Sequence, residues 1–220
     1  LVGNFGVAII LLTVIIRGLM FPIAQKQFAS MAQMKAVQPK MKEIQERFKD
    51  DKQRQQQEIM KLYKDEKINP AAGCLPILIQ IPIFYALFKV ISNTLELRHA
   101  SFFGWLNDLS GPDSSSLYNL FGLMPWDAPA AGTLTHMIFI GILPIILGIT
   151  MWLQFKLQPA QMDPVQQQVF AIMPWMMMFI MAPFAAGLQL YWVVNNILSI
   201  AQQWQITRMI ESAKPGTKVA

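Results

Sequence analysis

An arginine interrupts the apolar stretch Val7-Ala-Ile-Ile-Leu-Leu-Thr-Val-Ile-Ile-Arg17-Gly-Leu-Met-Phe-Pro22 near the start of the chain. With its flanks the stretch approaches the roughly 20 apolar residues that a helix needs to cross a bilayer. A guanidinium at that depth costs between about 2.5 and about 10 kcal/mol, depending on how far water and lipid deformation relieve it. A charge held at that cost usually has a function, so Arg17 is the first candidate site residue.

The composition of the whole chain is that of a polytopic membrane protein. Of 220 residues, 54% are hydrophobic and 14% charged, and the mean hydropathy is +0.36. Soluble domains carry about 25% charged residues, so the deficit of charge is the stronger signal. The chain starts at Leu1 with no signal-type segment ahead of the first apolar run. We therefore expect a processed chain, or a piece of a longer one.

Metal, cofactor and nucleotide chemistry have no support in the sequence. Cys74 is the only cysteine, which excludes an intrachain disulfide, and His99 and His136 match no metal-ligand spacing. No phosphate-binding loop, G-x-S-x-G or H-E-x-x-H motif occurs. We therefore expect a protein that has no cofactor or metal site and is not an enzyme.

Five apolar stretches predict an all-α bundle of five transmembrane helices. The predicted helices cover residues 1–25 (apolar from residue 4), 75–95, 134–155, 165–183 and 187–206. The connecting segments are 26–70, 96–133, 156–164 and a tight turn at 183–187, and a tail follows over 207–220.

Basic residues set the predicted orientation. Segment 26–70 carries eleven of the eighteen Lys and Arg residues, whereas 96–133 has only Arg98 against four acidic residues. Because Lys and Arg concentrate on the cytoplasmic side, segments 26–70, 156–164 and the tail are predicted to be cytoplasmic. The N-terminal end and the 96–133 loop are then outside, in the periplasm.

Segment 26–70 is predicted to form a hairpin of two short amphipathic helices. Its first apolar stripe has coiled-coil spacing and consists of Met34, Val37, Met41, Ile44 and Phe48. Asp50-Asp51 ends that stripe, and Pro39 within it predicts a kink or a helix start. The candidate docking residues are Lys40, Lys42, Arg47 and Lys49. In the alternative interpretation, these charges have no docking role and only keep the hairpin soluble and set the topology.

Arg17 has no acidic partner within the predicted spans, which contain no Asp or Glu. Lys89 lies close enough to the outer end of its span to snorkel. Proton-coupled transporters normally keep a carboxylate or a histidine relay in the membrane, so that class is disfavoured. A wet cavity, or an acidic group on a visiting substrate, would satisfy Arg17. Thr13 shares its helix face one turn away.

Further polar side chains could line such a cavity, although each could equally hydrogen-bond a neighbouring helix. They are Gln80, Gln189, Tyr191, Asn195, Asn196, Gln202 and Gln203. The aromatic clusters at 102–106 and 120–126 are expected to be interfacial anchors. The methionine-rich run at 173–181 suits varied apolar partners, or simply core filling.

Several motifs follow one another in a recognisable order. They are Thr13–Pro22, Gln38-Pro-Lys40, Asn69–Pro76, Leu78–Phe84, Asp163-Pro164 with the glutamines after it, and Gly187–Asn196. Together they resemble the core of the YidC membrane protein insertases, of the YidC/Oxa family, in a bacterial and Gram-negative form. The resemblance covers essentially the whole chain.

The resemblance implies five helices around a hydrophilic groove that opens to the cytoplasm and the lipid and is closed to the outside. Arg17 would be its positive charge, and the candidate groove residues are Arg17, Thr13, Gln80, Tyr191, Trp192 and Asn196. The hairpin would receive substrate, and the 156–164 loop and the tail would lie near the ribosome.

The function expected from the resemblance is insertion of newly synthesised membrane proteins into the bacterial inner membrane without nucleotide hydrolysis. Its partners would be nascent membrane proteins, the ribosome, the Sec translocon, the signal recognition particle receptor and membrane lipids, without nucleic-acid specificity. Two alternatives stay open: an assembly factor that acts only beside a translocon, and a small anion channel or transporter with a cationic pore.

Overall fold

The computed structural model describes residues 3–69, 75–126, 133, 135, 139–157 and 164–212. In these residues the regular structure is helical throughout, which confirms the all-α class. The elements are α1 (Phe5–Leu19), α2 (Phe21–Arg47), α3 (Lys52–Asp65), α4 (Leu75–Asn93), η2 (Leu95–Leu97), η3 (Leu117–Gly122), α6 (Ile142–Leu157), α7 (Pro164–Met181) and α8 (Ala186–Ser212). Cys74, His136, most of the predicted 156–164 loop and the tail beyond Ser212 lie outside the described residues.

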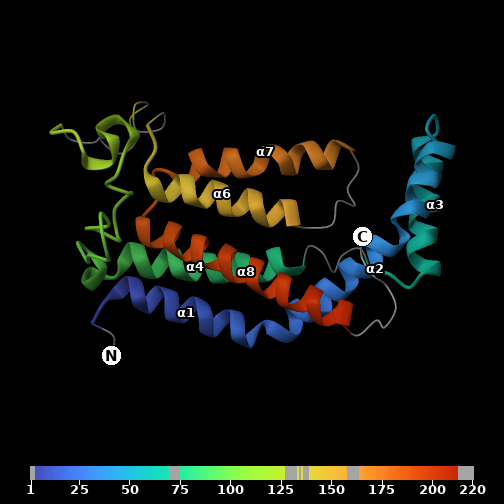
Figure 1. Cartoon of the computed structure of the whole chain (residues 1–220), viewed down its shortest axis with the longest axis horizontal. Coiled ribbons are helices and arrows are strands. Elements are labelled where there is room, and N and C mark those ends of the chain that lie inside the picture. The colour runs from blue at the N-terminus through green and yellow to red at the C-terminus, as the bar shows by residue number, and fades with distance from the viewer. Residues whose placement is uncertain are drawn as a thin grey trace.

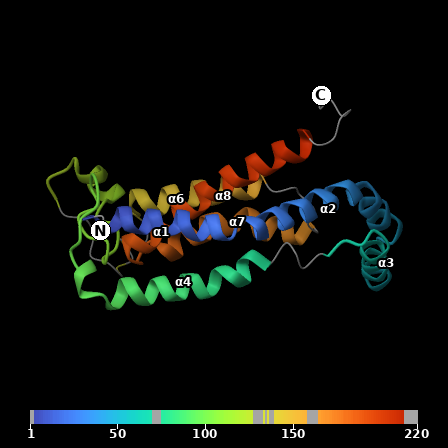
Figure 2. The same cartoon turned by 90° about the horizontal axis from the view of Figure 1, so that it is seen from below.

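Five helices form an elongated bundle: α1, α4, α6, α7 and α8 (Figure 1). The segment between α4 and α6 covers one end of the bundle, which we call the loop end (Figures 1 and 2). At the other end, the hairpin end, α2 leads away to α3. Helices α1, α6 and α8 run from the loop end to the hairpin end, and α4 and α7 run back.

The first apolar stretch is bent rather than straight. Helix α1 starts at the cap Asn4, whose Oδ1 accepts from the Val7 N–H at 3.2 Å, and it ends at Leu19. Pro22 cannot donate to the carbonyl four residues before it, and its ring crowds that carbonyl, so the helix breaks near Met20. The axis turns by 59° there. The predicted single helix over 1–25 is therefore two helices.

The helices differ in how closely their length and apolar character match those of a membrane span. Within the described ranges, no single helix of at least 18 residues is apolar enough, but Phe5–Leu19 and Phe21–Ser30 meet the criterion as a bent pair. The helical stretches Leu78–Asn93, Ile142–Leu157 and Gln168–Met181 are apolar and shorter.

The hairpin is formed by α2 and α3, which end and begin around the predicted Asp50-Asp51 break. The Asp51 carboxylate accepts from the Arg54 N–H at 3.0 Å and so caps α3. Of the predicted kink or helix start at Pro39, the start is wrong, because α2 continues through Pro39. Pro39 is exposed, so water can bond to the carbonyl that it leaves unpaired.

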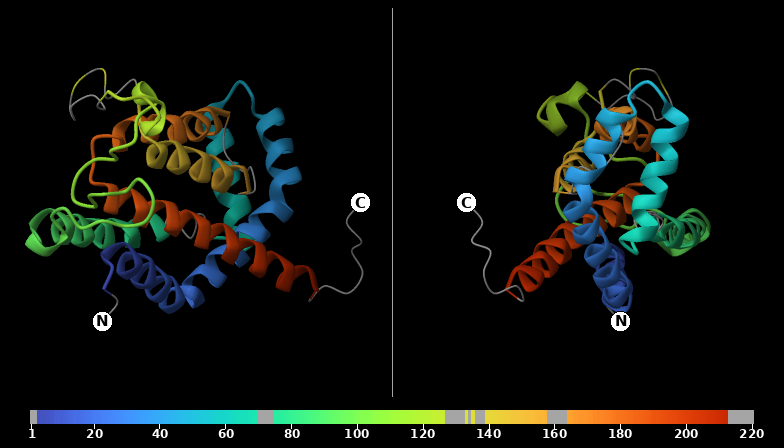
Figure 3. Two further views of the ribbon diagram at one scale, coloured as in Figure 1. Left: turned by 60° about the vertical axis from the view of Figure 1, so that its left-hand side comes forward. Right: turned by 90° about the vertical axis from the view of Figure 1, so that its right-hand side faces the viewer.

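Polar contacts and a small apolar core join the two helices of the hairpin. Val37 and Met41 are buried, and the Tyr63 hydroxyl donates to the Met41 sulfur at 3.1 Å. Gln55, also buried, donates from Nε2 to the Gln45 carbonyl at 2.9 Å. Beyond its crossing with α2, α8 points away from this hairpin (Figures 2 and 3).

One short segment of the loop, residues 109–115, holds the starts of two helices, and we call it the clamp. Its first half serves α8: the Ala186 N–H donates to the Gly111 carbonyl at 2.6 Å, and the Gly187 N–H to the Leu109 carbonyl at 2.9 Å. Leu109 is fully buried. A Cβ at Gly187 would lie 3.0 Å from that Leu109 oxygen, so glycine permits the close approach.

The second half of the clamp serves α6. The Leu143 N–H donates to Asp113 Oδ2 at 2.7 Å, and the Ile142 N–H to Ser115 Oγ at 2.8 Å. Asp113 Oδ1 accepts from both the N–H and the hydroxyl of Ser115. A carboxylate at a helix N-terminus satisfies free N–H groups and complements the helix dipole. This capping explains why α6 begins at Ile142; most of residues 134–138, where the predicted helix starts, lie outside the described residues.

A second carboxylate, Asp108, fixes the turn ahead of the clamp. Its Oδ1 accepts from the hydroxyl and N–H of Ser110 at 2.7 and 2.8 Å. Partial burial acts to raise the pKa of Asp108, but these bonds, with those from Gly111 and His99, outweigh it and lower the pKa below its usual value. The turn is therefore held by an ionised Asp108 at neutral pH.

Replacing Asp113 tests the clamp. We expect Asp113→Ala to lower the free energy of unfolding by about 2 kcal/mol, because a buried N–H at the start of α6 loses a charged acceptor. Chemical unfolding of the purified protein in detergent measures this. Ser114→Ala is the matched control, since that exposed hydroxyl donates only to the Trp105 carbonyl. Equal stability of Asp113→Ala and the parent would contradict the clamp.

Candidate functional site

Helix α8 carries polar side chains on two faces, and these face different neighbours. Consecutive helical residues are about 100° apart, so Asn195 and Gln202, seven positions on, share one face. Both contact Arg17 of α1. Asn196 and Gln203 share the next face and contact α6, where they donate to Thr150 Oγ1 at 3.3 Å and to the Leu157 carbonyl at 2.7 Å.

Arg17 is held by neutral groups. Its Nε donates to Asn195 Oδ1 at 2.7 Å, and its Nη2 lies 3.4 Å from the Asn195 carbonyl. Gln202 Nε2 donates to the Arg17 carbonyl at 3.1 Å, which ties the end of α1 to α8. No ion pair to Arg17 is formed by any residue that the structure describes. Asn195 therefore orients the half-buried guanidinium without cancelling its charge.

Thr13 lies one turn from Arg17, as the helical period requires, but it is fully buried. Its hydroxyl donates to the Ile9 carbonyl of its own helix at 2.6 Å. That bond uses the only proton that the hydroxyl has, so Thr13 can offer a ligand only its oxygen lone pairs.

Gln80, Tyr191 and Trp192 meet where α4 lies along α8. Gln80 Nε2 donates to the Tyr191 hydroxyl oxygen at 2.6 Å, and Tyr191 is 1% exposed. The Trp192 ring packs edge-on against Phe84 of α4, with centroids 5.1 Å apart. The structure thus brings these three predicted site residues to one helix–helix contact.

The sequence prediction chose Asn196 for the groove, whereas the structure shows that Asn195 is the partner of Arg17. Asn196 is directed toward Thr150 of α6. The two adjacent asparagines lie about 100° apart around α8 and here face different helices. The spacing along α8 does not distinguish them, because Asn195 and Asn196 each have a glutamine seven residues on, Gln202 and Gln203.

Another buried polar group remains on α8. Gln189 is fully buried and donates from Nε2 to the Phe184 carbonyl at 2.8 Å. Its Oε1 has no hydrogen-bond partner among the described residues.

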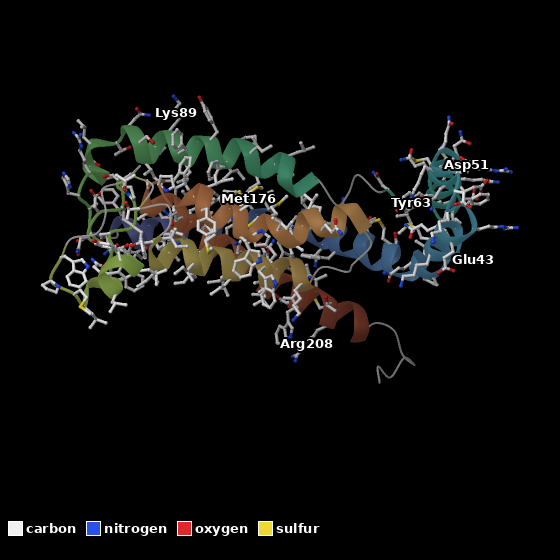
Figure 4. All side chains as sticks on the ribbon, turned by 90° about the horizontal axis from the view of Figure 1, so that it is seen from above. Glu43, Asp51, Tyr63, Lys89, Met176 and Arg208 are labelled. Atoms are coloured by element: carbon white, nitrogen blue, oxygen red, sulfur yellow. The ribbon has the colours of Figure 1, made fainter. Side chains whose placement is uncertain are left out.

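In the methionine-rich helix α7, Met181 is buried and Met176 is 49% exposed (Figure 4), so the run contributes both to the core and to the surface.

The four basic docking candidates on the hairpin are not equivalent. Lys40 forms an ion pair with Glu66 at 2.6 Å, and its hydrogen bond and charge attraction to that carboxylate raise the pKa of Lys40. Arg47 lines an open hollow of about 640 Å³ between α2 and α3. Lys42 and Lys49 are exposed. Glu43, Asp51 and Tyr63 are on the same hairpin (Figure 4).

Metal binding has no constellation to support it in the part of the chain that is described. No three His, Cys, Asp or Glu side chains there come close enough to hold an ion.

Beside its apolar core, the bundle buries several polar side chains and exposes many large apolar ones. Thr13, Gln189 and Asn196 are at most 3% exposed, whereas Leu19 and Ile172 are 76% and 63% exposed. Polar groups buried between helices and apolar side chains on the outside suit a hydrocarbon surrounding. The fold and site therefore define a helical membrane protein.

Comparison with known families identifies the group. The model of the family described as "60Kd inner membrane protein" matches residues 1–214. The chain belongs to this inner membrane protein family.

Relatives in the family carry a common name. A protein of Ruegeria sp. (strain TM1040) called "Membrane protein insertase YidC" is 58% identical over 207 residues, which cover 94% of this chain and 34% of that protein. Its namesake in Cereibacter sphaeroides (strain ATCC 17029 / ATH 2.4.9) is 57% identical over 208 residues, covering 94% and 33%. The chain thus spans about a third of the length of these relatives.

A solved structure has the same fold. The structure described as "Active YidC insertase crystal structure with the first transmembrane domain resolved" superimposes with a TM-score of 0.64 at 27% identity. The match covers 91% of this chain and 41% of that one.

Removing the amide of Asn195 tests how Arg17 is held. We expect Asn195→Leu to lower the free energy of unfolding by about 1 kcal/mol, since an interhelical bond to a charged group is lost. Unfolding in detergent gives the value. The matched control is Asn93→Leu, which removes an amide bond within α4 and touches neither Arg17 nor α8. If both variants unfold alike, Asn195 does not support Arg17.

Proposed function

We propose that this chain forms an insertase core, in which Arg17 attracts the acidic flank of a newly made membrane segment. One observation carries the proposal: the guanidinium is oriented by the neutral amide of Asn195, so its charge is not cancelled, and Gln202 holds only the backbone carbonyl of Arg17. The names of the relatives support the same activity.

In this proposal the five bundle helices cross the membrane, with the loop end outside and the hairpin end in the cytoplasm. A hydrophilic groove opens to the cytoplasm and the lipid. Arg17, held by Asn195, is its charge, with Gln80, Tyr191 and Trp192 at the contact of α4 and α8, and the proposed residues Thr13 and Asn196 lie buried behind it. The alternating direction of α1, α4, α6, α7 and α8 is compatible with five crossings (Figure 1). The concentration of basic residues in segment 26–70 supports the orientation.

Insertion needs no nucleotide in this scheme. The groove lowers the cost of bringing a short polar flank part of the way across the bilayer. The apolar part of the substrate then passes into lipid, which releases about 0.8 kcal/mol per CH₂ removed from water. Arg17 acts on the flank by electrostatic attraction, and no bond is made or broken.

The hairpin is the proposed docking element, and its exposed cations give it a surface for partners. Lys42, Arg47 and Lys49 are available there, whereas Lys40 is already paired with Glu66. The ribosome, the Sec translocon and the signal recognition particle receptor are the proposed partners.

An internal carboxylate placed beside Arg17 tests the electrostatic step. Asn195→Asp would supply the missing counter-ion, and we expect insertion of a substrate with an acidic flank to slow about fivefold, the effect of about 1 kcal/mol on a rate. Insertion into proteoliposomes of purified protein is the measurement. Arg17→Ala should slow the same substrate, and Arg17→Lys should slow it less.

The matched control is the same substrate with its acidic flank residues replaced by their amides. Its insertion should differ little between the parent and Asn195→Asp. Equal slowing of both substrates would mean that the variant damages the fold, which its unfolding in detergent would also reveal. If Arg17→Ala inserted the acidic substrate as fast as the parent protein does, the role of the charge would be refuted. Anion flux through the purified protein would instead favour the channel alternative.

A further inference from the structure

Two aromatic–cation pairs lie near the hairpin end of the bundle. On α6, Lys156 Nζ is 4.8 Å from the centroid of the Trp152 ring. On α8, the Arg208 guanidinium carbon is 3.7 Å from the centroid of the Trp204 ring. In each pair the cation follows the tryptophan by four residues, so it lies one turn nearer the helix end.

One interhelical hydrogen bond sets the level of one pair relative to the other. Gln203 Nε2 donates to the Leu157 carbonyl at 2.7 Å, and these residues directly adjoin Trp204 and Lys156. This bond fixes the end of α6 against α8. Trp204 is therefore level with Lys156, and the α8 pair lies at least one turn nearer the helix end than the α6 pair.

Both cations are available to an outside anion. Neither forms an ion pair with a carboxylate of the described chain, and both are exposed. A guanidinium that stacks on a ring uses its face, so its N–H edge remains free for two parallel hydrogen bonds to a phosphate. Arg208 projects outward from the bundle, on the side opposite Lys89 (Figure 4).

The surface around the pairs is apolar. Ile149 precedes Trp152 by one turn and is 50% exposed, and Leu153 and Leu157 beside it are 39% and 47% exposed. On α8, Ile197 lies two turns before Trp204 on the same face and is 50% exposed. A tryptophan between an apolar stripe and a cation has the arrangement of a membrane interface. An RNA backbone would gain nothing from such a stripe.

We propose that the Trp152–Lys156 and Trp204–Arg208 pairs bind the phosphate headgroups of anionic phospholipids in the leaflet at the hairpin end. The acyl chains lie along the apolar stripes of α6 and α8, and Lys156 with the level Trp204 marks the depth of the headgroups. Such binding fixes the vertical position of these two helices. It does not depend on the insertase proposal, because no substrate takes part.

Native mass spectrometry of the full chain in detergent, titrated with phosphatidylglycerol or phosphatidylcholine, tests the proposal. We expect the parent to retain phosphatidylglycerol preferentially. Each of Lys156→Gln and Arg208→Gln should weaken that retention about fivefold, the effect of one basic residue at an anionic surface. Arg208→Lys should keep most of it. Trp204→Leu, which removes the stacking platform, should weaken it as well.

Lys89→Gln is the matched control. Lys89 also follows an aromatic residue, Tyr85, by four positions, with Nζ 5.7 Å from the ring centroid, but it lies toward the loop end (Figure 4). Its removal should leave phosphatidylglycerol retention unchanged. Competition by inorganic phosphate at equal concentration would show a free-anion site and overturn the proposal. Unchanged phosphatidylglycerol retention in the Lys156→Gln/Arg208→Gln double variant would also overturn the proposal. So would a double variant that loses binding of a short RNA but keeps its phosphatidylglycerol.

Discussion

The bundle has to hold one guanidinium among helices whose described residues offer it no carboxylate. Helix α8 meets this constraint with amides: Asn195 accepts from the Arg17 side chain, and Gln202 donates to the Arg17 backbone. A carboxylate would bind more tightly, but it would also neutralise the charge. An amide fixes position and leaves the net charge in place. The same helix uses Asn196 and Gln203 toward α6, so its polar residues join the bundle on two sides.

Local patterns can be recognised in a sequence. They predicted an all-helical chain with Arg17 as its central residue. These patterns each extend over only a few helical turns. They are the apolar runs, the four-residue spacing between Thr13 and Arg17, and the Asp50-Asp51 break. The choice between Asn195 and Asn196 depended instead on the rotation of α8 relative to α1. A rotation of about 100° exchanges these two residues, and apolar content around α8 is too even to fix it.

Two other features were outside the reach of local patterns for different reasons. The bend at Met20 has a local cause in Pro22, but a proline in the first turn of a helix is equally compatible with a clean start. The caps on α6 come from Asp113 and Ser115, some thirty residues upstream. No spacing rule connects a helix N-terminus with a side chain at that distance. Pro39 shows the reverse, since a strong local breaker signal was overridden within a long helix.

Directly after the clamp, Ser116 and Leu117 bring two distant parts of the chain together. The Leu117 N–H donates to the Ile140 carbonyl at 3.2 Å, and the Ser116 hydroxyl to the Phe139 carbonyl at 2.6 Å. The excursion between these points therefore leaves and rejoins the fold at one place. Extending a closed loop adds little entropy cost, so this excursion can lengthen, shorten or be exchanged during evolution while α6 and α8 stay where they are. It is the natural position for a lineage-specific insertion or an engineered reporter domain.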